Sequence, residues 1–340
     1  MPTHSILNRL PHDPRSQRGF TLIELMISLV IGLLLSAAIV KIYVDTSQIY
    51  KFQNAVSEVQ ENGRFASAFL RRAARLAGNF GCDASKDISG STLSDAEATR
   101  LQFFNGAPPQ PAQPIGGSEG GGINSDELIL RGSTGGGVRL EDNPASAAAN
   151  LIVETDSGLT DDSFAVISDC NTTHIFEITG VADRTITHTG TTQAYTTGKG
   201  ARVQEVQAVT YCIGQAQAWT AVNNLMALKR LINPGAGQTC PNNGEELVEG
   251  IQNLQVRYGE DLNNDGFADR YVTATTADMA NVKTLRIELL VRSLANGVTS
   301  TAVPPTLAGA AIPLAANDRY LYKVMTNTIT LRNSCDPNCQ

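Results

Sequence analysis

Histidine and clustered positive charge are scarce in this chain, and their scarcity excludes several kinds of function. The 340 residues include four histidines, of which only His174 and His188 lie beyond the first 19 residues. No nucleophile has a plausible general base beside it, and no spacing suggests a catalytic pair of carboxylates. Lys and Arg number 26 against 33 Asp and Glu, a net charge of −7, without a cluster that would bind nucleic-acid phosphates. We therefore expect neither an enzyme nor a nucleic-acid-binding protein.

One apolar stretch dominates the N-terminal part of the sequence. Residues 20–40 contain a single charge, Glu24, and at about 1.5 Å per residue they cross the roughly 30 Å hydrocarbon core of a bilayer. Apolar residues then recur at intervals of three, four and seven as far as Ala77, with charged residues between them. This pattern predicts one helix over residues 20–77, membrane-embedded in its first half and amphipathic in its second.

The charges around the apolar stretch indicate its orientation. Residues 1–19 contain Arg9, Arg15 and Arg18 against one acid, Asp13, which keeps this leader in the cytoplasm by the positive-inside rule. Glu24 is either a functional carboxylate or a side chain that snorkels to the interface. An ordinary secretory signal is the alternative, cleaved after the apolar run near Ser36-Ala37-Ala38.

A specific motif favours the functional interpretation of Glu24. The residues Gly19-Phe20-Thr21-Leu22-Ile23-Glu24 resemble the processing signal of type IV prepilins. The resemblance implies that a membrane peptidase cuts after Gly19 and that the new N-terminal Phe20 is methylated. It also implies that Glu24 meets the terminal amine of a neighbouring subunit during filament assembly.

Cysteine usage is consistent with an exported domain. All six cysteines follow the apolar stretch, and an even number on the outward side predicts disulfides in an oxidising compartment. A zinc site is disfavoured because no paired C-x-x-C knuckles are present. Six cysteines permit 15 pairings. The pairs we expect are Cys82–Cys170, Cys212–Cys240 and Cys335–Cys339, the last because Asp-Pro-Asn forms a turn.

Beyond residue 77 the sequence predicts β-structure. Short β-prone runs divided by turn residues continue to the C-terminus, so the fold class is α+β, with a β-rich domain over residues 78–340. A first strand is expected at residues 99–105. The Pro- and Gly-rich residues 108–122 are expected to be an exposed loop, in which Gly116-Gly117-Ser118-Glu119-Gly120 matches G-x-S-x-G by chance. The pattern leaves residues 245–254 open between a helical turn and a strand.

One acidic segment has the spacing of a calcium loop. Oxygen-bearing side chains alternate from residue 261 to residue 269, with Gly266 where an EF-hand turns sharply. The twelfth position, which holds a bidentate Glu in EF-hands, is Val272, so any Ca²⁺ site is weak or takes a ligand from elsewhere. A hairpin turn without a metal is the equal alternative. The expected ligands are Asp261, Asn263, Asp265, the Phe267 carbonyl and Asp269.

The C-terminal two thirds of the chain carry a second resemblance. Residues 247–259, the acidic turn with Arg270-Tyr271, and the ending at residues 320–333 resemble minor pilins of the PilW type, which are similar to the J-type pseudopilins of type II secretion. The resemblance implies the pilin-like fold, a long N-terminal helix packed on antiparallel sheet.

That resemblance also implies location and partners. The protein is expected in the inner membrane, with its N-terminus cytoplasmic before processing by the prepilin peptidase, and then in a cell-surface pilus. The implied partners are other minor pilins and the major pilin, in a complex that primes assembly near the pilus tip. Two alternatives stay open at this point, a secretion pseudopilin and an anchored surface enzyme, adhesin or lectin.

Overall fold

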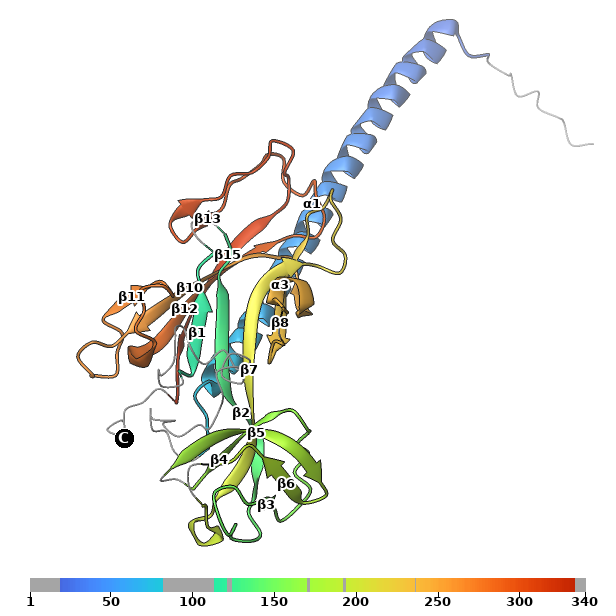
Figure 1. Cartoon of the computed structure of the whole chain (residues 1–340). Coiled ribbons are helices and arrows are strands. Elements are labelled where there is room, and N and C mark those ends of the chain that lie inside the picture. The colour runs from blue at the N-terminus through green and yellow to red at the C-terminus, as the bar shows by residue number, and fades with distance from the viewer. Residues whose placement is uncertain are drawn as a thin grey trace, which may run out of the picture. The chain divides into compact units, whose positions relative to one another are not determined.

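The computed structural model describes residues 19–81, 113–120, 124–169, 172–191, 194–235 and 237–333. The chain divides into two compact units, Met1–Lys51 and Phe52–Gln340. Their boundary falls within one continuous helix, α1 (Leu22–Leu76), the long blue-to-cyan ribbon of Figure 1. The first unit is, in its described part, the N-terminal portion of α1 with Gly19, Phe20 and Thr21 before it.

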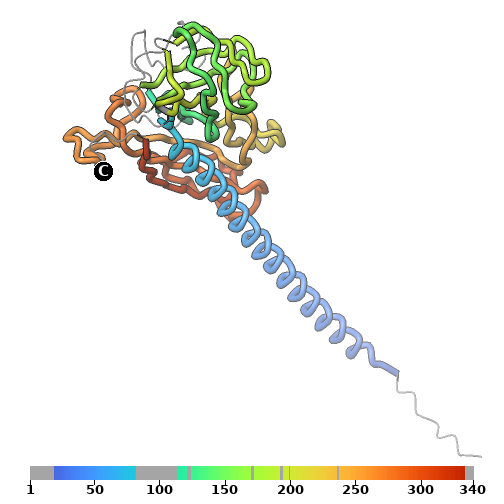
Figure 2. Tube along the Cα trace, turned by 90° about the horizontal axis from the view of Figure 1, so that it is seen from below, coloured from blue at the N-terminus to red at the C-terminus, as the bar shows by residue number. Residues whose placement is uncertain are grey.

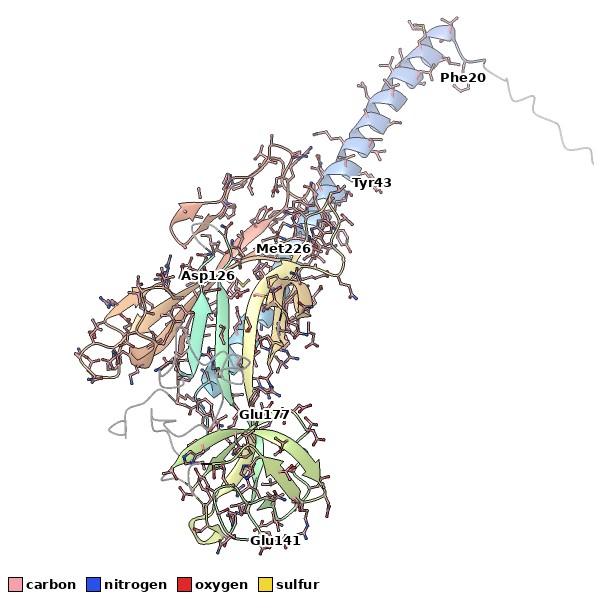
Figure 3. The ribbon with its side chains drawn as sticks, viewed as in Figure 1. Phe20, Tyr43, Asp126, Glu141, Glu177 and Met226 are labelled. Carbon is pink, nitrogen blue, oxygen red and sulfur yellow. A yellow bond between two sulfur atoms is a disulfide. The ribbon has the colours of Figure 1, made fainter. Side chains whose placement is uncertain are left out.

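The first unit exposes almost all of its side chains. Between residues 22 and 51 every residue except Ser47 is exposed. This portion is long and apolar enough to cross a membrane, with none of its apolar window buried. The Phe20 and Tyr43 side chains project away from the ribbon in Figure 3. In water such a surface would be unfavourable by about 25 cal/mol per Å².

In the second unit, α1 packs one face against a sheet. Its buried residues recur at intervals of three and four, as expected for an amphipathic helix. Gly63 permits a close approach, since a Cβ there would lie 2.3 Å from Met325 Sδ and 3.1 Å from Val291 Cγ2. The helix ends at Leu76, and Gly78 just beyond it has a φ of 77° that favours glycine and an N–H that donates to the Arg131 carbonyl. The buried residues are Ala55, Val59, Gly63, Ala66, Ser67, Leu70 and Ala74.

The sheet next to α1 has four strands in the described part of the chain, ordered β11-β10-β12-β15 and all antiparallel. Figure 2 shows its orange and red strands beside the helix. Side chains of α1, of this sheet and of the neighbouring sheet form the largest core. The strands are β10 (Ile251–Glu260), β11 (Arg270–Val272), β12 (Val282–Arg292) and β15 (Tyr322–Thr330); η2 (Met279–Asn281) leads into β12, and β13 (Thr306–Leu307) pairs with β14 (Ala310–Ala311).

A larger sheet of nine described strands follows the order β1-β2-β7-β4-β5-β6-β3, with β8 on β7 and β9 on β8. The long strands β2 and β7 continue from the main core into a second core built around β3 to β6. The strands are β1 (Ile115–Ser118), β2 (Glu127–Arg139), β3 (Leu151–Ile152), β4 (Phe164–Ser168), β5 (Thr173–Ala182), β6 (Thr185–His188), β7 (Arg202–Gln215), β8 (Met226–Ile232) and β9 (Glu245–Glu249), with the short helices η1 (Thr197–Lys199) and α3 (Cys240–Asn243). The α+β class expected from the sequence is confirmed.

In one segment the structure differs from the sequence-based expectation, and in another it settles a choice that the sequence left open. The Gly-rich tract expected to be a loop contains β1, which pairs with β2. A Cβ on Gly117 of β1 would stand 2.0 Å from the Tyr258 hydroxyl and 2.6 Å from the Glu127 carbonyl oxygen, so this position needs glycine. Residues 245–254 are strands, and the chain turns between β9 and β10 at Gly250, whose φ is 80°. The strand expected at residues 99–105 lies outside the described residues.

One of the three expected disulfides lies in the described residues and is confirmed. Cys212 of β7 is bonded to Cys240 of α3, with 6.0 Å between their Cα atoms. Both cysteines are buried with Leu231, so the bond fixes α3 against the larger sheet. The other pairs, Cys82–Cys170 and Cys335–Cys339, fall outside the described residues.

Candidate functional site: the start of α1 and the acidic hairpin

The first turn of α1 places the motif carboxylate in a defined position. Thr21 stands just before the helix and Glu24 three residues later, the arrangement of a capping box. The Thr21 backbone N–H and hydroxyl each donate to Glu24 Oε2 at 3.0 Å, and the Glu24 N–H donates to the Thr21 hydroxyl at 3.3 Å. Glu24 therefore closes the start of its own helix.

The capping box leaves half of the carboxylate available. Both Thr21 bonds end on Oε2, and among the described residues no hydrogen bond reaches Glu24 Oε1. Gly19 and Phe20 precede the helix and are exposed, Phe20 to 90%. No other described residue therefore covers the Gly19–Phe20 bond, and Oε1 has room for a further donor without loss of the cap.

The remaining polar groups of the apolar stretch are satisfied within the helix. The Ser28 hydroxyl donates to the Glu24 carbonyl at 2.7 Å, and the Ser36 hydroxyl donates to the Gly32 carbonyl at 2.8 Å. A hydroxyl without a partner would be costly in hydrocarbon, whereas a hydroxyl bonded to the preceding turn is tolerated there. Glu24 is thus the one charged group in an otherwise lipid-compatible stretch.

The second portion of α1 also has an apolar surface that the sheet does not cover. Phe65, Phe69 and Leu76 are exposed, and their spacing of four and seven residues places them on one side of the helix. This stripe was not predicted from the sequence. The helical periodicity of the sequence could have indicated it, because Phe65, Phe69 and Leu76 are apolar but do not belong to the face of α1 that is buried against the sheet.

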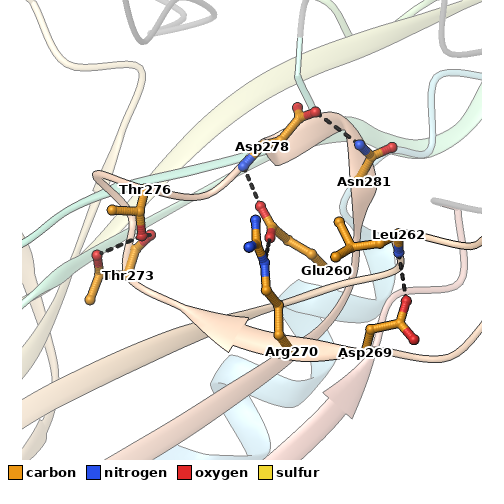
Figure 4. Close-up of polar contacts among 8 residues, drawn as sticks. All are labelled: Glu260, Leu262, Asp269, Arg270, Thr273, Thr276, Asp278 and Asn281. Carbon is orange, nitrogen blue, oxygen red and sulfur yellow. Dashed lines mark hydrogen bonds and ion pairs between the residues drawn. The ribbon is translucent and has the colours of Figure 1, made fainter.

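The acidic segment forms the turn of the β10–β11 hairpin and is held by its own side chains. Asp261 accepts the backbone N–H groups of Asp265 at 3.2 Å and Gly266 at 2.8 Å. Asp269 Oδ2 accepts the Leu262 N–H at 2.7 Å, as Figure 4 shows. Burial raises the pKa of Asp261, but the backbone donors outweigh it, so the pKa lies below its usual value. Backbone amides therefore already stabilise the ionised form of this side chain.

The other expected calcium ligands lie in the same turn. Asn263 Nδ2 donates to Asp265 Oδ2 at 3.1 Å and to Asp269 Oδ1 at 3.3 Å. Phe267 is 75% exposed at the tip, and its N–H donates to Asp265 Oδ1 at 2.9 Å. The expected ligands are thus neighbours, but side-chain oxygens of Asp261, Asn263, Asp265 and Asp269 accept donors of the protein. Across the described ranges no group of three or more His, Cys, Asp or Glu residues is arranged to hold a metal. Calcium binding stays a prediction.

An ion pair between a buried carboxylate and a half-exposed arginine at the base of this hairpin was not foreseen from the sequence. Glu260 is fully buried and accepts from Arg270 Nε and from the Asp278 N–H, both at 2.6 Å (Figure 4). The bond from Asp278 ties the hairpin to the segment that leads into β12. In the sequence Glu260 directly precedes the acidic segment, so nothing distinguished this buried carboxylate from the exposed carboxylates of the turn.

Two comparisons with known proteins agree with this geometry. Residues 210–333 match the family model described as type IV pilus-assembly protein W. Residues 14–40, which include the Thr21–Glu24 cap, match the prokaryotic N-terminal methylation motif. No curated protein matches the chain.

Proposed function

We propose that this chain is a type IV pilus minor pilin, similar to type IV pilus-assembly protein W and involved in pilus assembly. Glu24 has two roles in this proposal. It caps its own helix, and with the same carboxylate it binds a neighbouring subunit in the filament. In this proposal cleavage after Gly19 exposes the Phe20 amine, which is then methylated. The protein is a structural subunit rather than an enzyme.

The observation that carries the proposal is that only one carboxylate oxygen of Glu24, Oε2, accepts hydrogen bonds within the described part of the chain. The Phe20 amine is a cation and Glu24 an anion in a low-dielectric setting, and each is unfavourable without a partner. Oε2 is occupied by Thr21, while Oε1 accepts nothing among the described residues. The capping bonds fix where Oε1 points, so pairing with the amine of an adjacent subunit would set the axial register between helices.

The membrane and the pilus are successive locations in this proposal. The apolar portion of α1 anchors the precursor in the inner membrane by a single pass, with the leader in the cytoplasm for the prepilin peptidase. The mature chain then joins other minor pilins in a complex that primes assembly, sits near the tip and contacts the major pilin. A secretion pseudopilin would share the helix, but the match over residues 210–333 favours the pilus. Nothing in the described residues favours an adhesin or lectin role.

The test separates the charge of Glu24 from its capping role. Glu24→Gln keeps a side chain that can close the capping box but removes the charge, whereas Glu24→Ala removes both. We expect both variants to be processed and membrane-inserted, and both to be depleted in sheared pili relative to wild type. Asp45→Asn is the control, because it removes another charge of the same helix, one paired with Lys41 at 3.6 Å.

Three outcomes would be informative. Depletion of Glu24→Ala with normal Glu24→Gln would show that the cap matters and the charge does not. Wild-type incorporation of both variants would remove Glu24 from assembly. Equal depletion of Asp45→Asn would indicate a general effect of charge loss rather than a specific pairing.

Two further disulfides are expected in the exported domain. We propose Cys82–Cys170 and Cys335–Cys339 as the pairs outside the described residues. Support for the first comes from their described neighbours, since a Cβ on Gly81 would lie 2.7 Å from Ser168 Cβ. Cys82 is one residue and Cys170 two residues from this contact, within the reach of a disulfide. Peptide mapping without reduction would identify the pairs, and a Cys82–Cys335 peptide would contradict the assignment.

A further inference from the structure

The outer strand of the four-stranded sheet has a long unpaired edge. β15 pairs with β12 along its whole length in continuous register, from Thr284↔Thr330 to Arg292↔Tyr322. Its other edge pairs with no strand in the described part of the chain. Nine residues without proline or bulge form the kind of edge that another strand can join, and soluble proteins normally protect such edges. Lys323 is the one charged residue along it.

α1 turns this edge into one side of a groove. Asn327 of β15 donates to the Ser67 hydroxyl at 2.9 Å and accepts from Arg71 Nη2 at 3.1 Å, which holds the helix beside the strand. The groove between them has a volume of about 980 Å³. Phe65 and Met325 line it, so the groove offers an apolar surface next to the backbone groups of the edge.

The charges of the groove are mainly positive. Arg64, Arg71 and Lys323 line it against a single acid, Glu61. None of the three cations forms an ion pair with an acidic residue among residues that the structure describes. This local excess contrasts with the net charge of −7 of the whole chain. A ligand with acidic side chains would complement it.

We propose that the groove between α1 and β15 binds an extended acidic segment of a neighbouring pilus subunit, which adds to the sheet as a fifth strand. Strand addition gives affinity through backbone hydrogen bonds and specificity through alternate side chains. Here one side of the added strand packs on Phe65 and Met325, and its acidic residues meet Arg64 and Lys323. The inference rests on the proposed function, because neighbouring subunits lie next to the groove only when α1 is assembled into a pilus.

A strand fits this site better than a helix does. A helix satisfies its own backbone groups and would leave the β15 edge unpaired, whereas a strand pairs with it. The exposed Thr326 and Thr328 on β15 are β-prone residues suited to cross-strand contacts. The predicted interface is therefore distinct from helix-to-helix packing through the apolar portion of α1.

Photo-crosslinking in piliated cells tests the contact on the full chain. p-Benzoylphenylalanine is incorporated at Thr326, which lines the groove, or at the exposed Thr275 as the matched control outside it. We expect an adduct from position 326 alone, and mass spectrometry should place the partner peptide in a β-type segment of another pilus subunit that contains acidic residues. An adduct to a partner's N-terminal helix, or none, would overturn the proposal.

Charge reversal provides the quantitative test. Arg64→Glu with Lys323→Glu should reduce co-purification of the crosslinked subunit by at least about tenfold, because like charges now face each other across the interface. The control is Arg72→Glu with Arg75→Glu, which changes the net charge equally but at two positions of α1 outside the groove. Melting of the detergent-solubilised chain would show that both double variants are folded.

The two proposals can fail separately. If Glu24→Gln is depleted in pili while the groove double variant keeps its partners, the groove proposal is wrong and the proposed function stands. If the groove variant loses its partner while Glu24→Gln incorporates normally, strand addition stands without Glu24 pairing. Unchanged co-purification together with an adduct from Thr275 would overturn strand addition.

Discussion

The two portions of α1 share one backbone but have opposite environments. Leu33 in the first portion is 74% exposed, whereas Leu70 in the second is 1% exposed. In the second portion, apolar side chains at helical spacing are covered by the sheet, with charged residues opposite. In the first, apolar side chains are exposed on every side of the helix. The folded domain thus accounts for the second portion, while the first requires a membrane or other subunits.

Glycines show the same difference at the level of single atoms. A Cβ on Gly63 would overlap Met325 and press on Val291, while a Cβ on Gly32 would meet nothing within 4 Å. Gly63 is therefore constrained by the fold of this chain. Any constraint on Gly32 comes from partners outside it.

The largest contrast is expected from leucine truncation in the two portions. Leu70→Ala should lower the free energy of unfolding by about 2–5 kcal/mol, because it empties a fully buried site in the main core. Leu33→Ala should leave the unfolding of the second unit unchanged. Denaturant titration of the full chain in detergent, followed through the tertiary signal of the β-rich unit, measures both. A similar loss from Leu33→Ala would mean that the two portions are not independent.

A smaller contrast is expected from filling the glycines. Gly63→Val should destabilise the second unit by about 1–3 kcal/mol, since Met325 can move aside but the β-branched Val291 yields less. Gly32→Val should have no such effect and serves as the matched control. Thermal melting compares the two. Unchanged melting of Gly63→Val would show that α1 and β15 lie less closely together than the structure indicates.

Calcium should have the smallest effect, and only on the second unit. Without a carboxylate at Val272 we expect a Kd near 10⁻⁴ M, so a tenfold excess of Ca²⁺ would stabilise the fold by about 1.4 kcal/mol. Melting with millimolar Ca²⁺ and with chelator measures the shift. Asp265→Ala should abolish it, and Asp278→Ala, which lies outside the turn, should not. Equal melting temperatures in both buffers would mean that the backbone amides alone satisfy the carboxylates.

The sequence predicted well what depends on local pattern. Apolar periodicity and Gly78 located the helix and its end, and Asp261 with Gly266 located a tight acidic turn. The strand β1 was missed because Gly117 packs against Tyr258, a residue 141 positions away whose contact no local pattern encodes. The capping bonds of Glu24 were missed although Thr21 and Glu24 have the required spacing, because the carboxylate was interpreted only as a charge in lipid. The groove requires α1 and β15 together, which only the fold supplies.

The most direct test of the central claim is the intact mass of the protein recovered from purified pili. The account predicts residues 20–340 with a methylated Phe20, which shows that the apolar portion of α1 stays in the mature subunit and enters the filament. The Gly19→Leu precursor should stay uncut and be absent from pili. A mature chain that begins near Ile39, or an uncut wild-type chain, would contradict the account.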